Sequence, residues 1–426
     1  MSVAIRPRLA ADVSVRKLAG ARGLVVNGPR QAGKSELLRM LQRRLGGTLL
    51  TLDEPQHLRL ARADPTGFVQ DRAHPLMIDE VQRGGDPLVL AIKIILDTSQ
   101  ERGQVVLAGS TRFLTEPRLS ESLAGRVRFV DLWPFSQGEV EQLGSSGDRL
   151  LDCLLRPTDE LYQSGRSAPG LRRREIYHRL CIGGFPEAVL ASSQRDRAEF
   201  FTDYVRAVGR RDITELSRMA DRIELQAVLR LVAERTGSLL NAASLAAAIG
   251  TSQDSMRRYL PLVETVFLSY QLPAFASGSA VRARRRPKLH MTDTGLAAAL
   301  LGVTPDRLLD PATKIVGQLL ETFVLMEVVK QTTWSEEQVR LSHYRDPDDR
   351  EVDIIVEAPD GRVAGVEVKA AVDVAPRDFR CLAYLRDRLG TRFTNGIILH
   401  CGREAARWGD RLTSLPLAAL WTSPNG

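Results

Sequence analysis

The stretch GLVVNGPRQAGKSELLRMLQRRLGG, residues 23–47, decides the fold of the N-terminal part of the chain. It opens with a β-branched run typical of a strand and turns through glycine. It then continues with leucines at positions 37, 38, 41 and 45, the spacing of a helix. A strand that passes through Gly-x-x-x-x-Gly-Lys-Ser into a helix is the arrangement of a phosphate-binding loop.

The residues of this loop have distinct expected roles. Backbone N–H groups and the positive end of the helix would wrap a β-phosphate, and the Lys34 ammonium would reach the β- and γ-phosphates. The Ser35 hydroxyl would bind Mg²⁺. A glycine turn beside a chance Lys-Ser pair is the alternative, but the flanking strand and helix also fit a phosphate loop. The predicted phosphate-binding residues are Gly28, Pro29, Arg30, Gln31, Ala32, Gly33, Lys34 and Ser35.

Two later segments compete to be the acidic strand that holds the metal, LLTLDE at 49–54 and LMIDE at 76–80. The first follows the loop helix after a very short turn, so we predict that it is the neighbouring strand. The second leaves room for an intervening helix and is the better candidate. Asp79 would then hold Mg²⁺ through water, and Glu80 would polarise the attacking water.

A third apolar segment, QVVLAGST at 104–111, is predicted to be a strand that ends in small polar residues. Ser110 or Thr111 could reach the γ-phosphate or the attacking water. A plain cap of the strand end is the alternative for both.

With these motifs the chain resembles the AAA-type ATP-binding proteins of bacteria and archaea that carry a C-terminal domain of unknown function. The resemblance implies ATP rather than GTP, and no Asn-Lys-x-Asp guanine motif is present. The matching stretches span most of residues 20–215: GPRQAGKS, TLDEPQHLRLARADP, LMIDEVQ, LAGSTRF, ESLAGRVRFVDLWPFSQGE, CIGGFPEAVL and YVRAVGRRDI.

The resemblance also implies a homo-oligomer, with an AAA-type ring as one form. In such assemblies an arginine of one subunit reaches the γ-phosphate bound by its neighbour. Arg126 in SLAGR and Arg211 in GRRDI are the matching candidates. An arginine that only pairs with a surface carboxylate is the alternative for each.

Composition indicates a globular, reduced protein. A length of 426 residues predicts two to four domains, and no apolar run is long enough to cross a membrane. The N-terminus lacks a signal-peptide pattern and the four cysteines lack zinc spacing, so we expect a cytoplasmic protein. The net charge of +7 weakly favours a polyanionic partner. Lysine is rare among the basic residues, and Lys34 and Lys369 lie in motifs that call for a compact ammonium.

The middle of the chain is predicted to be helical. Residues 146–235 are rich in arginine and interrupted by Gly183, Gly184 and Pro186, and we interpret them as a helical lid. Residues 236–311 predict a winged helix-turn-helix, because one helix stops at Gly250 and a second begins after a Thr-Ser cap. The second helix has an apolar stripe formed by Met256, Leu260, Val263 and Phe267.

Basic residues on that second helix and in the following wing predict contact with nucleic acid, with DNA favoured. Such charges act by neutralising backbone phosphates. A solvated loop or a wing that docks a protein is the alternative. The candidate residues are Arg257, Arg258, Arg282, Arg284, Arg285, Arg286 and Lys288.

The segment EVDIIVEAPDGRVAGVEVKAAV, residues 351–372, predicts a hairpin in which 357 pairs with 363. Asp353 then lies opposite Glu367, and Lys369 points to the same face as Glu367. With Glu321 on the preceding helix, the carboxylates could hold Mg²⁺ while the lysine orients or deprotonates a water. This pattern resembles the restriction-endonuclease-like nuclease fold. The alternatives are a surface cluster of ion pairs and a nuclease-like domain that only binds.

The chain is therefore expected to be an α/β protein in four parts. These are a P-loop ATPase core of AAA type at 1–145, a helical lid at 146–235, a winged helix-turn-helix at 236–311 and a restriction-endonuclease-like domain at 312–426. Its expected function is ATP hydrolysis with Mg²⁺, coupled to nucleic acid and without a membrane. The alternative from another class is an ATP-driven regulatory switch whose C-terminal domain docks proteins.

Overall fold

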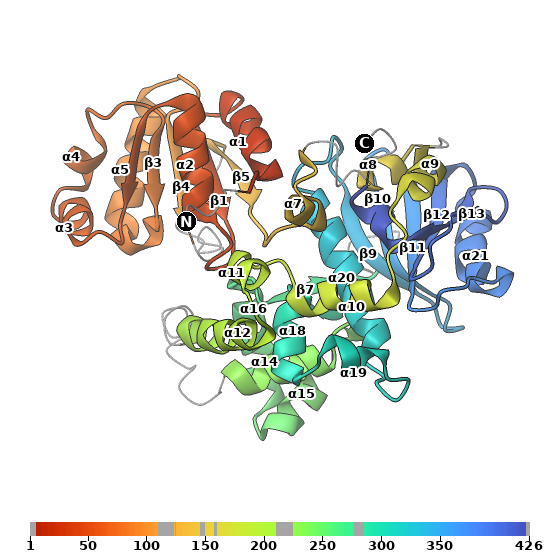
Figure 1. Ribbon diagram of the computed structural model, residues 1–426. Coiled ribbons are helices and arrows are strands. Elements are labelled where there is room, and N and C mark those ends of the chain that lie inside the picture. Colours follow the sequence, from red (N-terminus) through yellow and green to blue (C-terminus); the bar gives the residue numbers. More distant parts are fainter. Residues whose placement is uncertain are drawn as a thin grey trace. The chain divides into compact units, whose positions relative to one another are not determined.

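The computed structural model describes residues 6–109, 123, 125–144, 150–156, 160–209, 225–276 and 285–422. The chain divides into two compact units. Unit 1 comprises Met1–Pro134 with Thr265–Phe267, and unit 2 comprises Phe135–Glu264 with Leu268–Gly426. Figure 1 labels the helices and strands of both units.

Unit 1 is built on a parallel sheet with the strand order β2-β3-β4-β1-β5. Every residue of β1 and β4 is buried, as expected for parallel strands covered on both faces. The strands are β1 (Gly23–Asn27), β2 (Thr48–Thr51), β3 (Leu76–Asp79), β4 (Val105–Gly109) and β5 (Val127–Asp131).

This order shows where the two acidic segments lie relative to the loop strand. The segment at 76–80 forms β3, which is separated from β1 by β4, so its predicted place away from the loop strand is confirmed. The segment at 49–54 does not neighbour the loop strand, because β2 pairs with β3 at the edge of the sheet. Only Leu50 of β2 is buried, whereas the fully buried β4 fills the central position beside β1.

Helices cover both faces of this sheet. Val25, Ile78 and Leu107 pack into a core with side chains of the helices that follow β2 and β3. The alternating residues Leu24 and Val106 are equally buried, and the first two helices contact the sheet as well. The helices are α1 (Leu9–Ala19), α2 (Lys34–Leu45), α3 (Pro55–Ala63), α4 (Pro65–Val69), the 3₁₀ turn η1 (Val81–Gly84) and α5 (Gly85–Thr98).

Unit 2 begins with helices that differ in part from the predicted lid. Leu154 O in α8 accepts hydrogen bonds from Thr394 and Asn395 of a C-terminal strand, and Gln331 Oε1 accepts one from Leu151 N. The first part of the predicted lid therefore packs on the C-terminal sheet, because it supplies partners to buried polar groups there. The helices are α7 (Gln137–Glu141), α8 (Leu150–Leu154), α9 (Glu160–Ser167), α10 (Arg173–Ile182), α11 (Pro186–Leu190) and α12 (Gln194–Val208).

The next part of unit 2 contains two helices that meet at Gly250, which has a left-handed φ of 76°. The Ser252 hydroxyl accepts a hydrogen bond from Ser255 N, so one of the two predicted caps is confirmed. Of the predicted apolar stripe, Met256, Leu260 and Val263 are buried on the second helix, whereas Phe267 is buried but lies beyond the end of that helix, in unit 1. Three short antiparallel strands follow the order β6-β8-β7. The elements are α14 (Leu225–Glu234), β6 (Ser238–Leu239), α15 (Ala242–Ile249), α16 (Gln253–Thr265), β7 (Ser269–Leu272) and β8 (Lys288–Met291).

The C-terminal part has a mixed sheet with the order β13-β14-β12-β11-β10-β9. The predicted hairpin is confirmed, because β10 and β11 are antiparallel and Glu357 pairs with Val363. Helix α21 covers the sheet with Leu382 and Leu385. The elements are α18 (Thr294–Leu301), α19 (Pro305–Leu309), α20 (Val316–Gln331), β9 (Arg340–Arg345), β10 (Glu351–Glu357), β11 (Val363–Lys369), α21 (Arg380–Leu389), β12 (Phe393–His400), β13 (Ala406–Arg407) and β14 (Leu412–Pro416).

The sequence of helix α20, GQLLETFVLMEVVKQ at 317–331, suggests an amphipathic helix, but the structure differs. Its residues 322–331 are all buried, so the helix is enclosed on every side. Its buried charges are compensated within the fold, since Lys330 Nζ donates to Glu327 Oε1 at 2.7 Å and to Phe135 O at 2.9 Å.

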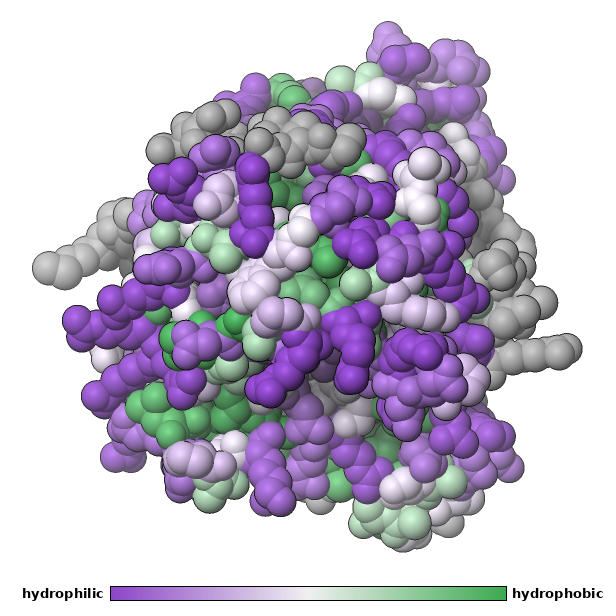
Figure 2. Space-filling view, turned by 90° about the vertical axis from the view of Figure 1, so that its right-hand side faces the viewer, coloured by the Kyte–Doolittle hydropathy of each residue, from purple (hydrophilic) through white to green (hydrophobic). Residues whose placement is uncertain are grey.

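The face drawn in Figure 2 carries mainly hydrophilic residues, with apolar residues in smaller areas among them. Among the helices that the structure describes, none is long and apolar enough to cross a bilayer.

Candidate functional sites

The loop between β1 and α2 has the backbone that a phosphate site requires. Gly33 caps α2 with a left-handed φ of 96°, a conformation that favours glycine. A Cβ added at Gly28 would lie 2.2 Å from Leu132 O, so only glycine allows the loop to pass this close to the chain after β5. The loop therefore needs glycine at position 28 for steric reasons and at position 33 for its backbone conformation.

Lys34 occupies the position that the sequence predicts. It is buried at the start of α2, and its Nζ donates hydrogen bonds to Gly28 O at 3.0 Å and Pro29 O at 2.8 Å. These partners are neutral carbonyl groups of the same loop. Ser35, the next residue of the helix, is exposed. A phosphate at this loop would meet the ammonium and the helix N-terminus together.

Asp79 and Glu80 lie at the carboxyl end of β3, at the same edge of the parallel sheet as the loop after β1. Asp79 is buried, and its Oδ1 accepts a hydrogen bond from Glu80 N at 3.0 Å. Glu80 has a left-handed φ of 53°, a costly conformation for a side chain of this size. Gln82 Nε2 donates to Glu80 Oε2, which fixes the carboxylate's direction. Ser110 and Thr111 lie outside the described residues.

The nucleotide loop fits a phosphate with a magnesium ion. Gly28 and Gly33 give the loop its shape, since a Cβ at Gly28 would clash with Leu132 O and Gly33 has a left-handed φ; a hydroxyl and a buried carboxylate are available at this sheet edge. Ser35 and Asp79 would hold the ion, which would neutralise phosphate charge when bound. Both residues were predicted for this role from sequence.

Arg8 supports the loop and was missed by the sequence interpretation. Its Nη1 donates to Ala32 O at 2.7 Å and its Nη2 to Trp133 O at 2.7 Å. The guanidinium thus joins the phosphate loop to the segment after β5, and the side chain is buried. No local sequence pattern marks this role, because Arg8 is 24 residues from Ala32.

Of the two candidate arginines for a neighbouring subunit, only Arg126 lies in the described part of the chain; Arg211 lies outside it. Arg126 precedes β5, and its guanidinium forms a two-point ion pair with Asp97 near the end of α5. Its side chain is 26% exposed and that of Asp97 is 40% exposed. A partly exposed pair of this kind contributes little to stability. The pair is therefore compatible with both roles considered for Arg126, reaching the nucleotide of a neighbouring subunit or only pairing with a surface carboxylate.

The candidate residues for nucleic acid are divided by the structure. Arg257 and Arg258 are exposed on α16, and Arg285 and Arg286 are exposed just before β8. Arg282 and Arg284 lie outside the described residues. The prediction for Lys288 is wrong. Lys288 is the first residue of β8 and is buried, so it is not a surface contact for phosphate.

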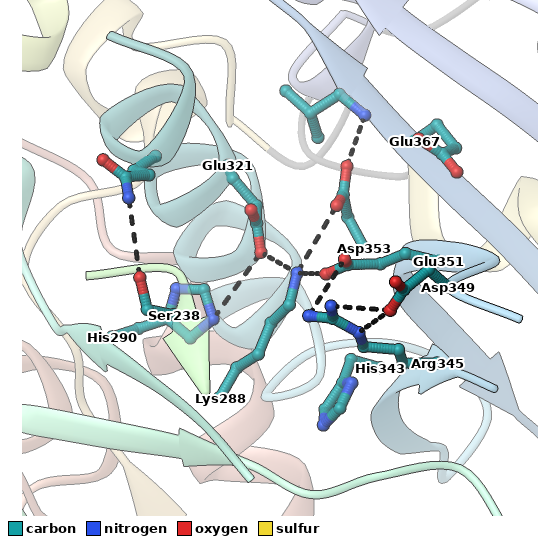
Figure 3. Close-up of polar contacts among 12 residues, drawn as sticks. Ser238, Lys288, His290, Glu321, His343, Arg345, Asp349, Glu351, Asp353 and Glu367 are labelled. Carbon is teal, nitrogen blue, oxygen red and sulfur yellow. Dashed lines mark hydrogen bonds and ion pairs between the residues drawn. The ribbon is translucent and has the colours of Figure 1, made fainter. Parts of the chain in front are cut away.

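Lys288 lies instead at the centre of a carboxylate cluster (Figure 3). Its Nζ is 2.8 Å from Glu321 Oε1, 2.5 Å from Glu351 Oε1 and 3.5 Å from Asp353 Oδ1. The carboxylates come from α20 and β10, and all four side chains converge. An ammonium has three donors, and here each faces a carboxylate. From the sequence, Glu321 and Asp353 are expected together, whereas Glu351 and Lys288 are not.

The remaining predicted residues adjoin this cluster on β11. Asp353 Oδ2 accepts a hydrogen bond from Val368 N at 2.9 Å, which holds the carboxylate against the strand that carries Glu367. Lys369 Nζ lies 3.4 Å from Glu367 Oε2. The Glu367 side chain is 7% exposed, whereas that of Lys369 is 38% exposed. The predicted proximity of Asp353 and Glu367 therefore follows from the hairpin register.

The electrostatics of the cluster reflect burial among like charges. Burial, followed by the Asp353 carboxylate, raises the pKa of Glu321 to about 8 and that of Glu367 to about 8. Burial lowers the pKa of Lys288, but the carboxylates of Glu321, Asp353 and Glu351 outweigh it and raise the pKa above its ordinary value. The lysine is therefore held in its charged form.

The cluster in its present arrangement does not fit a divalent metal ion. Oxygens of Glu321, Glu351 and Asp353 face the Lys288 ammonium, and Glu367 faces Lys369. In the described ranges, no group of three or more His, Cys, Asp or Glu side chains is arranged to hold a metal. Asp353, Glu367 and Glu321 were predicted to hold Mg²⁺, but a lysine lies at the point where the carboxylates converge.

Comparison with known proteins assigns the N-terminal part of the chain. Residues 21–141 match the AAA domain family, residues 173–307 match a domain of unknown function (DUF8612), and residues 316–420 match another (DUF4143). Residues 21–141 therefore form an AAA-type, P-loop ATPase-like domain, which implies nucleotide binding. The resemblance to AAA-type proteins with a C-terminal domain of unknown function is confirmed at this level.

Individual relatives are distant. An uncharacterized protein of Mycobacterium tuberculosis is 29% identical over 355 residues, which are 83% of this chain and 71% of the relative. One from Haemophilus influenzae is 24% identical over 233 residues, 53% of this chain and 52% of the relative.

Solved structures similar to this chain include a Walker-type ATPase of Pyrococcus abyssi, with a TM-score of 0.41 and 12% identity over 68% of this chain and 94% of that one. The RuvB Holliday junction branch migration motor of Thermotoga maritima has a TM-score of 0.29 and 15% identity over 69% and 94%.

Proposed function

We propose that this chain hydrolyses ATP with Mg²⁺ and acts on nucleic acid, with DNA favoured. The observation that carries the ATPase proposal is the juxtaposition of the Lys34 loop with Asp79 and Glu80 at one edge of a parallel sheet. Phosphoryl transfer to water depends on positioning and charge stabilisation, and these residues supply both.

Each of these residues has a specific role in the proposal. Lys34 binds the β- and γ-phosphates, since its ammonium is buried in the loop and a charged phosphate attracts it more strongly than the neutral carbonyls of Gly28 and Pro29 do. Glu80 polarises the attacking water, because its carboxylate is fixed beside the buried Asp79. Arg8 keeps the loop in its binding form through Ala32 O.

The order of elements α14, β6, α15, α16, β7 and β8 supports a winged helix-turn-helix in the proposal. The sheet order β6-β8-β7 is the one expected when a hairpin follows two helices. Arg257 and Arg258 are exposed on α16, the second helix, and Arg285 and Arg286 are exposed at the end of the wing. Exposed arginines in these places neutralise phosphates of a nucleic-acid backbone.

The C-terminal part supports a restriction-endonuclease-like fold in the proposal. Helix α20 precedes the antiparallel strands β9, β10 and β11, and β12 joins β11 in parallel after α21. Asp353, Glu367 and Lys369 occupy the strands expected to carry such a site. We propose nucleic-acid binding rather than cleavage for this domain, because the Lys288 ammonium lies among the carboxylates.

Self-association completes the proposal. Arg126 lies before β5 with its side chain partly exposed, and one subunit would present it to the nucleotide of the next. Mixing Arg126→Ala protein with Lys34→Ala protein should restore turnover if Arg126 acts in trans. Arg211→Ala, tested in the same way, separates the two candidates. Restored turnover with neither mixture would remove both arginines from this role.

The deciding experiment measures the ATPase rate of the full chain with and without duplex DNA over a range of salt concentrations. We expect DNA to change the rate and to bind with an affinity that falls steeply with salt. A regulatory switch that docks proteins would hydrolyse ATP with no response to DNA. That result would replace the nucleic-acid proposal while leaving the ATPase in place.

A further inference from the structure

The carboxylate cluster of unit 2 has more negative than positive groups. The carboxylates are Glu321, Glu351, Asp353 and Glu367, and the cations are Lys288, Lys369 and Arg345, whose Nη1 lies 3.8 Å from Glu351 Oε2, so one carboxylate is left over. Buried charges of one sign are costly unless cations balance them. The cluster is therefore a place that attracts positive charge.

A second observation points to a ligand position here. His290, two residues beyond Lys288 on β8, is fully buried and faces the same glutamate, with its Nε2 3.9 Å from Glu321 Oε1. This nitrogen has no hydrogen-bond partner among the described residues, whereas Nδ1 is 3.0 Å from Thr322 Oγ1. A buried ring nitrogen directed at carboxylates is a potential ligand for a cation.

The position of Lys288 is set by the fold rather than by a flexible side chain. All four residues of β8 are buried, and the strand is paired on both sides, to β6 and to β7. The residues just before it are held on β9, since Arg285 Nη1 donates to Arg345 O and His343 Nε2 lies 3.2 Å from Arg286 O. The ammonium is thus delivered to one point among the carboxylates.

We infer that the Lys288 ammonium occupies the position that a divalent cation would take among these carboxylates, so the wild-type cluster holds no metal there and the chain carries its own substitute for one. Glu321, Glu351 and Asp353 would be the oxygen ligands once the lysine is removed. Hard carboxylate oxygens at a buried position suit Mg²⁺ or Mn²⁺. The inference rests on the nuclease-like arrangement proposed above and explains why that arrangement binds rather than cuts.

The test is Mn²⁺ binding to nucleotide-free full-length protein, followed by electron paramagnetic resonance of free Mn²⁺. Lys288→Ala should bind one more Mn²⁺ than wild type, at least about tenfold more tightly than any wild-type site in unit 2. Adding Glu321→Gln to this variant removes a ligand and should weaken that binding by about 10–100-fold. Lys330→Ala is the matched control, because Lys330 is also buried and paired, but to the single carboxylate of Glu327.

Two results would overturn the inference. One is a folded Lys288→Ala protein that binds no more Mn²⁺ than Lys330→Ala. The other is a wild-type protein that already binds a Mn²⁺ lost in Glu321→Gln, and this measurement needs no change at Lys288. Lys288→Met, which keeps most of the side-chain volume, serves if the alanine variant does not fold. Because no nucleotide or DNA is present, failure here is separate from failure of the ATPase or DNA proposals.

Discussion

Two buried lysines in this protein differ in their partners and in their expected roles. Lys34 in unit 1 donates hydrogen bonds to two neutral carbonyls of its own loop, Gly28 O and Pro29 O. Lys288 in unit 2 is held by three carboxylates from α20 and β10. An ammonium is attracted more strongly by a carboxylate or a phosphate than by a neutral carbonyl, so we expect the first lysine to exchange its carbonyl bonds for a phosphate while the second is retained. Burial of a lysine alone therefore does not identify a ligand site.

The two regions also differ in what builds them. The nucleotide loop is made of backbone, with Gly28 and Gly33 allowing its shape and Arg8 supporting it. The carboxylate cluster is made of side chains from a helix and three strands. A backbone cradle is left open for a ligand, whereas converging side chains must neutralise one another when no ligand is present.

The largest expected effect is at Lys34. Lys34→Ala removes the ammonium that meets the phosphates, and the loss of two charge-assisted contacts should weaken ATP binding by at least about 100-fold. Stability should change less than in Lys288→Ala, because the loss does not leave a cluster of carboxylates without its cation. Calorimetric titration with ATP measures the first expectation and urea unfolding the second. Lys17→Ala, which loses an exposed bond to Phe129 O, is the control; unchanged ATP affinity in Lys34→Ala would break the comparison.

Glu80→Gln should separate binding from turnover at the nucleotide site. The amide keeps the size of the side chain but cannot polarise water as a base, so we expect turnover to fall by about 10²–10⁴-fold. ATP affinity should remain close to that of wild type. Phosphate release under saturating ATP gives the rate, and calorimetry gives the affinity. A loss of affinity equal to that of Lys34→Ala would instead place Glu80 in structural support of the loop.

At Lys288 the expected effect is on stability rather than on ATP. Lys288→Ala leaves buried carboxylates without their cation, which should reduce the free energy of unfolding by about 3–5 kcal/mol. Urea unfolding followed by tryptophan fluorescence reports this, since Trp334, Trp408 and Trp421 all lie in unit 2. ATP binding should be retained. If stability is unchanged while ATP binding is lost, the two lysines do not differ in the way proposed.

The smallest expected effect concerns DNA. Arg257→Ala with Arg258→Ala should lower the slope of log affinity against log salt by about 1.8, since each phosphate contact contributes about 0.9. The control is Arg195→Ala with Arg206→Ala, two exposed arginines of α12 in the same unit. Fluorescence anisotropy of labelled duplex DNA at several salt concentrations measures both slopes. Equal slopes in the two double variants would remove α16 from the proposed interface.

The rarity of lysine in this chain marks more buried positions than the sequence interpretation used. From the sequence, only Lys34 and Lys369 were singled out among the few lysines. In the structure, Lys288 and Lys330 are both buried and ion-paired. Lys288 was instead grouped with the arginines that precede it and assigned to a surface. Its exposed neighbours Arg285 and Arg286 show why, since the change from surface to core occurs within three residues where β8 enters its sheet.

The hairpin was predictable for a local reason. A short turn at 358–361 sets the register of β10 and β11, so Glu357 pairs with Val363 and Asp353 comes close to the strand of Glu367. Helix α20 was predicted in position but not in environment. Its pattern suggested one exposed face, while the segment containing α8 and the strand β11 both pack against it.

By itself, the sequence determined the nucleotide loop, its acidic partner strand and the C-terminal hairpin, because each depends on residues within one turn or one strand-to-helix junction. The tertiary structure alone decided that Arg8 supports the loop and that Lys288 meets Glu321, Glu351 and Asp353. These contacts join residues 24 to 125 positions apart or bring three elements to one point. Their distances are set by how sheets and helices pack, a property that no short stretch of sequence contains.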